Sequence, residues 1–337
     1  MDANHTSEGD DGRRDAEGRR RFPYAAYFGE VNLAPQLLLA PEEISWLSKI
    51  PANPAPRETV LYLGCQALKT PHFCLEAMDV LTSLGTDFAA FGGSAVCCGS
   101  VHQFFGNDLD LAERVSQSTT AKIASFKARN VLTICPNCNY QYEKGAASEG
   151  DVPFRMRHFY DFLHERLADL RFVAPLKKKI GLHRHAGSSH HQDEHGQKCF
   201  EILSAIPGVT VVDLPAFDEL GVICYGRAHR KLDDRRHAEI MDALFSAATA
   251  EGCDIVATIY HACQRELCQE ERRGAFEVKS VVGLVAEALG HRHEDKLKRL
   301  KKLGDVDAAM KELAPNIAAH GIDPCVARTL LSSLLNA

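Results

Sequence analysis

Short apolar runs alternate along this chain with longer segments in which apolar residues recur every three or four positions. Runs of about four to eight apolar residues are typical of buried strands, and the longer repeat is typical of helices that bury one face. In the first half the runs predict strands at 59–63, 87–91 and 130–134. Helices are predicted between them at 73–84 and 108–128, and a helical segment follows at about 158–170. The predicted order is β-α-β-α-β.

The same order then starts again in the second half of the chain. Strands are predicted at 179–182, 209–212 and 254–259, and helices at 194–206 and 230–250. The segment VLTICPNCNYQY at 131–142 aligns with VATIYHACQREL at 256–267, with four of twelve positions identical. Strands that alternate with crossover helices form parallel sheets, so the sequence predicts an α/β protein with two pseudo-symmetric parallel-sheet halves.

The segments outside the two halves have a different character. Residues 1–21 mix charges without a hydrophobic period, and PANPAP at 51–56 is typical of a linker. A basic stretch, KLKRLKK at 296–302, is interpreted as the solvated face of a helix. The predicted organisation is a disordered tail at 1–21, an N-terminal arm and linker at 22–58, a first half at 59–170, a second half at 171–290 and a helical C-terminal extension at 291–337.

The composition adds an excess of sulfur and imidazole groups to this picture. The 337 residues include 12 cysteines and 16 histidines, with a net charge of only −6. Disulfide frameworks belong to short secreted chains, and no apolar leader precedes this one, so we expect a soluble cytoplasmic protein with reduced thiols. We expect no membrane span, no nucleic-acid partner and no NAD or FAD, because no apolar stretch of about 18 residues, no strong basic balance and no nucleotide-binding glycine pattern occurs.

Five cysteines of the first half follow predicted strands at a distinctive spacing, C-x31-CC-G-x35-C-P-x-C. Carboxyl ends of parallel strands meet at one edge of a sheet, so these thiols are expected to lie together. An isolated CxxC would fit a zinc site or a redox pair, but one zinc ion needs only four ligands, and five thiols suit a cluster of several iron atoms better. Cys74 and Cys199 lie in apolar helical patterns and are predicted to be core residues.

This spacing resembles the cysteine-rich CCG domain found in the B-type chain of heterodisulfide reductase and in its relatives, where two such domains occur in tandem. The resemblance covers about 59–290, which includes both repeats. It implies that each complete domain binds a noncubane [4Fe-4S] cluster through five cysteines. In this sequence the implied ligands are Cys65, Cys97, Cys98, Cys135 and Cys138.

The second repeat departs from that pattern. Ala186 stands at the position of the first cysteine, Cys224-Tyr225-Gly226 replaces the CCG, and Tyr260-His261-Ala262-Cys263 replaces CPxC. Three interpretations stay open. The site has decayed, or it is a mixed nitrogen and sulfur site for zinc or for a second iron–sulfur centre, or its histidines donate protons in catalysis without a metal. The candidate ligands are His183, His185, His261, Cys224 and Cys263, and the candidate catalytic residues are His183, His185 and His261.

With one intact motif, we expect an iron–sulfur subunit of a heterodisulfide-reductase-like complex, an oxidoreductase acting on a disulfide, a persulfide or a thiol-bound sulfur. The sequence has no ferredoxin-type C-x2-C-x2-C-x3-C run, so electrons are expected to pass to or from other chains. The resemblance implies an iron–sulfur partner and a flavin partner, equivalent to the C-type and A-type chains of heterodisulfide reductase. The alternative is an electron-transfer or scaffold subunit of a CCG-containing dehydrogenase complex of the lactate or succinate type, with catalysis on a partner chain.

Overall fold

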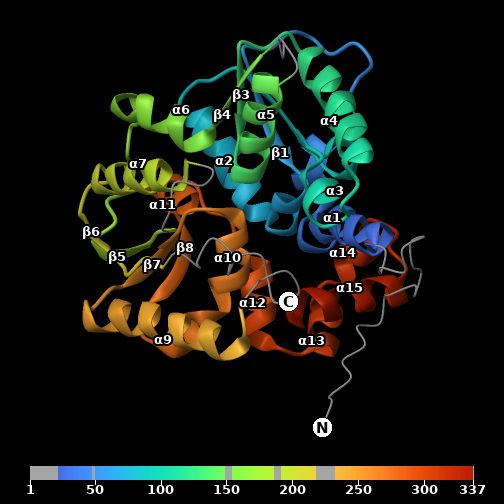
Figure 1. Cartoon of the computed structure of the whole chain (residues 1–337). Coiled ribbons are helices and arrows are strands. Elements are labelled where there is room, and N and C mark those ends of the chain that lie inside the picture. Colours follow the sequence, from blue (N-terminus) through green and yellow to red (C-terminus); the bar gives the residue numbers. More distant parts are fainter. Residues whose placement is uncertain (1–21, 48–49, 149–153, 186–190, 218–231, 337) are drawn as a thin grey trace.

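The computed structural model describes residues 22–47, 50–148, 154–185, 191–217 and 232–336. Its first half is built on a four-stranded parallel sheet in the order β2-β1-β3-β4 (Figure 1). The strands are β1 (Thr59–Gly64), β2 (Phe88–Gly92), β3 (Asn130–Thr133) and β4 (Arg155–His158). All six residues of β1 are buried, as its unbroken apolar run predicts.

The second half repeats this architecture with the strand order β6-β5-β7-β8, again parallel throughout. Its strands are β5 (Lys178–His183), β6 (Val209–Asp213), β7 (Ile255–Thr258) and β8 (Glu277–Ser280). The predicted fold class of two parallel-sheet α/β halves is therefore confirmed. In both sheets the chain leaves the two central strands toward opposite sides, which creates a switch point beyond their carboxyl ends, where such folds bind ligands.

Helices connect the strands of each half. In the first half they are the 3-10 helices η2 (Gln66–Lys69), η3 (Ser94–Val96) and η4 (Leu167–Asp169), with α2 (Pro71–Ser83), α3 (Ser100–Phe104), α4 (Leu109–Ala124), α5 (Pro136–Ser148) and α6 (Phe159–Glu165). In the second half they are α7 (Gln192–Ser204), α9 (Asp234–Ala250), α10 (His261–Leu267), η6 (Cys268–Arg273) and α11 (Val281–Ala288). Aspartate side chains cap the corresponding long helices: Asp108 accepts a backbone N–H at the start of α4, and Asp233 does so for α9.

The sequence pattern missed the fourth strand of each sheet. β4 has the sequence RMRH and β8 the sequence EVKS, so neither forms an apolar run, and each lies at the edge of its sheet. The helical segment predicted at about 158–170 corresponds to α6 and η4, which begin directly after His158 ends β4. α11 was also not predicted.

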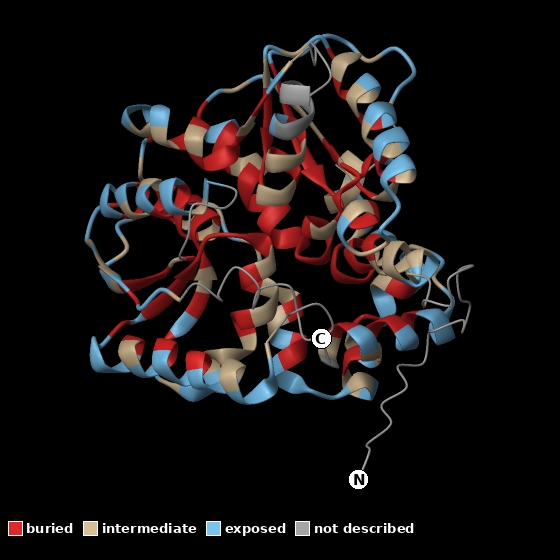
Figure 2. Ribbon diagram, viewed as in Figure 1, coloured by how far each residue is buried: buried red, intermediate tan, exposed pale blue. Residues whose placement is uncertain are grey.

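The carboxyl ends of the two sheets face each other at the centre of the molecule, where buried strands and helix starts meet (Figure 2). The hydroxyl of Tyr160 donates to the carbonyl of Ile259, just beyond β7, across this junction. Gln66, after β1, accepts from Arg265 of α10 at 3.4 Å, and α2 packs on α11. The loops that follow the strands of one half therefore lie against those of the other half.

The N-terminal arm and the C-terminal extension pack together as one helical unit that contacts both halves. The arm consists of α1 (Tyr24–Leu38) and η1 (Pro41–Leu47), and the extension of α12 (Lys296–Leu303), α13 (Val306–Glu312), α14 (Ala314–Ala319) and α15 (Pro324–Asn336). Ala34, Leu37 and Leu38 of α1 form a buried cluster with apolar residues of the C-terminal helices, including Leu300 and Leu331. Two segments almost 260 residues apart thus share one core.

The basic helix α12 is less solvated than the sequence suggested. Lys298 and Lys302 both pair with Glu271, at 2.6 and 2.7 Å, and Arg299 pairs with Glu312. Lys301 is only 2% exposed, so the prediction of a purely solvated face was wrong at this residue. Among the helices in the described ranges, none has both the length and the apolar character needed to cross a membrane.

The shared core of arm and extension predicts a measurable loss of stability. We expect Leu300→Ala to lower the free energy of unfolding by about 2–5 kcal/mol, because Leu300 is fully buried and the change leaves a cavity. Leu303→Ala, on the same helix but 49% exposed, should change it by no more than about 0.5 kcal/mol. Denaturant unfolding checks both values, and equal effects would contradict the packing of α12 described here.

Candidate metal centre

The five cysteines of the first-half motif lie at the switch point of the first sheet. Cys65 directly follows β1, Cys135 lies between β3 and α5, and Cys138 is in the first turn of α5. Cys97 and Cys98 follow η3, which comes after β2. Four of the five side chains are buried and Cys135 is partly exposed.

The five thiols form one continuous line of contacts. Cys97 hydrogen-bonds the thiols of both Cys65 and Cys98. Cys98 in turn hydrogen-bonds Cys138, which also hydrogen-bonds Cys135. The sequence predicted that these residues lie together, and the structure places them so. Five sulfur donors in a line exceed the four-ligand shell of a single zinc ion and fit a group with several metal atoms.

A rigid loop holds the paired cysteines against the first sheet. The Tyr62 hydroxyl of β1 donates to the carbonyl of Val96 at 2.6 Å, and Thr119 of α4 donates to the carbonyl of Cys97 at 2.8 Å. Gly99 has φ +91°, and a Cβ at this position would lie 2.5 Å from the carbonyl oxygen of Ala112. The third residue of the CCG motif must therefore be glycine for the loop to approach α4.

Hydrogen bonds among the thiols shift their pKa values in opposite directions. Contacts with Cys138 lower the pKa of Cys98 and Cys135 well below the usual value. Contacts with Cys65 and Cys98 raise the pKa of Cys97. Cys135 also precedes the amino end of α5, where the helix dipole favours an anion. A lowered pKa favours the thiolate, which is the form that binds metals.

Two neighbours of the cysteine line come from outside the first half, and the sequence analysis missed their place. His261 of α10 hydrogen-bonds Cys135 and so contributes to lowering the pKa of that thiol. Tyr27 of α1 lies close enough to Cys65 for the charge of that thiol to act with burial in raising the tyrosine pKa. Because both contacts are tertiary, no local spacing in the sequence indicated them.

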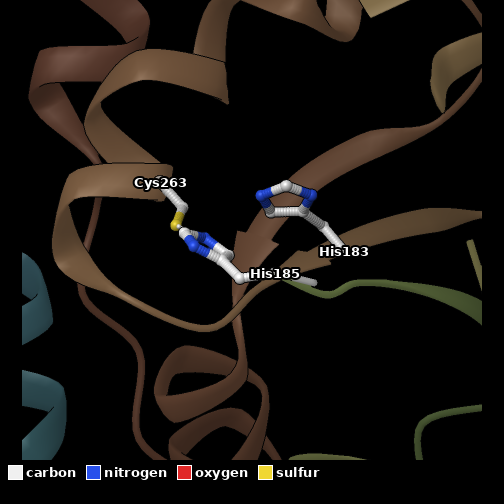
Figure 3. Close-up of side chains that lie close together, drawn as sticks. All are labelled: His183, His185 and Cys263. Carbon is white, nitrogen blue, oxygen red and sulfur yellow. Dashed lines mark hydrogen bonds between the residues drawn. The ribbon is translucent and has the colours of Figure 1, made fainter. Parts of the chain in front are cut away.

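A second group of metal-binding side chains lies at the equivalent edge of the second sheet (Figure 3). One donor atom each of His183, His185 and Cys263 lies within 4.8 Å of the others, and all three residues are buried. The His185 Nε2 atom is 3.0 Å from the sulfur of Cys263. His183 is at the end of β5, and Cys263 is in the first turn of α10. Burial lowers the pKa of His183 below its usual value, which favours the neutral imidazole.

The remaining candidates of the second repeat have other positions. His261 is not part of the group of three, although it was a candidate ligand and a candidate catalytic residue beside His183 and His185; it contacts Cys135 instead. Cys224, with its neighbours Tyr225 and Gly226, and Ala186 lie outside the described residues. Cys74 and Cys199 are fully buried in the apolar core.

Buried aromatic groups that the sequence did not single out surround this second group. Nδ1 of His195 lies 2.9 Å from the hydroxyl of Tyr260, and the rings of His195 and His158 are 4.1 Å apart between centroids. His158 ends β4, so the fourth strand of the first sheet also brings an imidazole to the junction. Burial lowers its pKa well below the usual value. The position of His158 at the end of a strand could have identified it as a candidate, but β4 was not predicted.

An open cavity of about 430 Å³ lies between the two halves, lined by residues of α5, β4, α6 and α7. Its wall includes Tyr142, Asp161 and Lys198, together with His191, whose imidazole pairs with Glu143 at 2.9 Å. Tyr142 also belongs to one buried cluster with Cys98 and Cys138. Burial, together with the charges of these two thiols, raises the pKa of Tyr142. This residue therefore links the cavity wall to the cysteine line.

Comparison with known families agrees with the cysteine geometry. Residues 59–143 match the CCG family model, described as a cysteine-rich domain. The matched range contains all five cysteines of the line and ends before the second repeat begins. This part of the chain is thus similar to a CCG cysteine-rich domain. The comparison with curated proteins found no match.

Solved structures with some similarity are racemases. The aspartate racemase of Picrophilus torridus is 11% identical with a TM-score of 0.34, covering 73% of this chain and 99% of that one. A putative Asp/Glu racemase of Yersinia pestis is 10% identical with a TM-score of 0.35, covering 68% and 97%. An aspartate racemase homologue of Pyrococcus horikoshii OT3 is 9% identical with a TM-score of 0.30, covering 69% and 97%.

The conformation of Gly99 makes a second prediction. Gly99→Ala should lower the free energy of unfolding by about 2–4 kcal/mol, because it adds both a positive-φ strain and a clash with the α4 backbone. Gly29→Ala is the matched control: no atom lies within 4 Å of the new Cβ in α1, so it should be neutral or stabilising by up to about 1 kcal/mol. Denaturant unfolding of the two variants measures this, and equal stabilities would refute the constrained loop.

Proposed function

We propose that this chain is an iron–sulfur redox protein whose first half binds one noncubane [4Fe-4S] cluster through Cys65, Cys97, Cys98, Cys135 and Cys138. The observation that carries the proposal is the continuous line of five thiols at the switch point of the first sheet. The match of residues 59–143 to a cysteine-rich domain supports the same ligand set.

The residues around the line fit such a group. When bound, the cluster supplies electrons to sulfur or accepts them from it. The protein holds the ligands in place through the loop of Val96 to Gly99, and His261 donates a hydrogen bond to Cys135, a contact of the kind that tunes the potential of a metal centre. The arm residue Tyr27 lies near Cys65, and its helix α1 packs against η2, which directly follows that cysteine.

We infer further that the chain acts on a disulfide, a persulfide or a thiol-bound sulfur as a subunit of a heterodisulfide-reductase-like complex. The resemblance of the cysteine motif and the partial exposure of Cys135 support this inference. Reduction of a disulfide consumes two electrons and two protons and releases two thiols. Those electrons come from iron–sulfur and flavin partner chains in the complex we propose.

One observation favours the alternative of an electron-transfer or scaffold subunit. His183, His185 and His261, the candidate proton donors, are at most 4% exposed. A substrate therefore has little access to these imidazoles. In that alternative the cluster passes electrons to a partner chain, and the sulfur chemistry takes place elsewhere.

The cluster ligands can be tested by single substitutions. In protein purified without oxygen, we expect Cys97→Ala to abolish the electron paramagnetic resonance signal of the cluster, because Cys97 contacts two other ligands, Cys65 and Cys98. Cys74→Ala is the control and should keep the signal, since its thiol only donates to the carbonyl of Ala67 in the core. A signal that survives Cys97→Ala would show that the ligand assignment is wrong.

Sulfur chemistry can be separated from electron transfer by counting thiols. We expect the reduced protein, mixed without oxygen with glutathione disulfide, to release two thiols for every two electrons it loses, and Cys97→Ala protein to release none. Colorimetric thiol measurement follows the reaction while an absorbance change follows oxidation of the protein. Oxidation by a redox dye without any thiol release from the disulfide would favour the electron-transfer alternative.

A further inference from the structure

The registers of the two sheets show which residues of the second half replace those of the first. Thr133 of β3 pairs with Tyr62 of β1, and Thr258, its counterpart in the internal repeat, pairs with His183 of β5. His183 therefore occupies the position of Tyr62. We continue this alignment beyond the pair without inserting or removing a residue.

By this correspondence His185 occupies the position of Gly64, and Cys263 occupies that of Cys138. In the first half, a Cβ at Gly64 would lie 2.9 Å from the sulfur of Cys138, so glycine lets that sulfur lie close to the strand. In the second half the position carries the imidazole of His185, whose Nε2 atom is 3.0 Å from the sulfur of Cys263. A residue without a side chain is thus replaced by a residue that is itself a metal ligand.

The three donors have the separation that one small ion requires. Tetrahedral zinc with nitrogen and sulfur ligands places neighbouring donor atoms about 3.5 Å apart, as follows from bond lengths of about 2.0–2.3 Å. The donor atoms of His183, His185 and Cys263 already lie within 4.8 Å of one another, from two elements that meet at the switch point of the second sheet (Figure 3). Only a small inward movement is needed for all three to bind one ion.

We propose that His183, His185 and Cys263 form a binding site for one zinc ion. On binding, the two imidazoles donate a nitrogen lone pair each, and the Cys263 thiol loses its proton to solvent and binds as thiolate, with no change of oxidation state. The thiolate excludes hard cations such as Mg²⁺ and Ca²⁺, which require oxygen ligands. This site is separate from the cysteine line of the first half and does not depend on the proposed cluster.

Neighbouring side chains fix the orientation of the ligands. The ring of Tyr260 contacts that of His185 edge to face, with centroids 5.3 Å apart. The hydroxyl of Tyr260 is held by Nδ1 of His195 at 2.9 Å. Tyr260 stands at the position of Cys135 in the repeat, so a cluster ligand of the first half is replaced here by a residue that supports the imidazole.

The test is the zinc content and zinc-edge X-ray absorption of the full-length protein, purified without oxygen and supplied with Zn²⁺ alone. We expect about one zinc per chain, with one sulfur neighbour and the remaining neighbours nitrogen or oxygen. Cys263→Ser and His185→Gln should each bind zinc at least about 10-fold more weakly. Cys253→Ser is the matched control. Cys253 lies before the start of β7, whereas Cys263 follows the end of that strand, so this variant should retain the ion.

Iron measured in the same samples keeps this proposal distinct from the proposed function, since loss of zinc from Cys263→Ser should leave the iron content unchanged. Because two ligand variants are compared, misfolding of one of them does not decide the result. The control variant shows whether loss of a buried thiol by itself changes the zinc content. Zinc with three or four sulfur neighbours would place the ion in the cysteine line and overturn the proposal. Retention of zinc by both ligand variants, or its absence from the wild-type protein, would also overturn it.

Discussion

Parallel strand pairing is the constraint on which this structure depends. In a parallel sheet every strand ends at the same edge, so the residues that follow β1 and β3 are brought together even though 70 residues separate Cys65 from Cys135. The two sheets then face each other with these edges, and the contact of Tyr160 with Ile259 joins them. Sulfur and imidazole groups from both halves are therefore buried at one junction, shielded from water by the remainder of the fold.

Within this shared geometry, single positions separate the chemistry of the two halves. Gly64 lets the sulfur of Cys138 lie close to the strand, and Gly99 lets the paired cysteines approach α4. His185, at the position of Gly64, contacts Cys263 instead. The first half thus presents five sulfur donors, and the second presents two nitrogens and one sulfur. A few substitutions within one repeated fold would account for the two different metal sites that we propose.

The sequence predicted the features that local pattern encodes. The order of strands and helices followed from apolar periodicity, and the cysteine line followed from spacing together with the rule that parallel strands end at one edge. The edge strands β4 and β8 carry charges in place of an apolar run, so pattern could not find them. The position of His261 beside Cys135 depends on how the halves pack, which a repeat alignment does not contain. The position of Tyr27, on α1, near Cys65 likewise depends on tertiary packing and not on local sequence.

The central claim is that one half holds a four-iron cluster and the other a single ion. It is tested most directly by counting iron, acid-labile sulfide and zinc in the full chain purified without oxygen. The account predicts about four irons, about four sulfides and about one zinc per chain. About eight irons would mean that the second half also holds a cluster, and protein that binds zinc but no iron would contradict the assignment of the cysteine line.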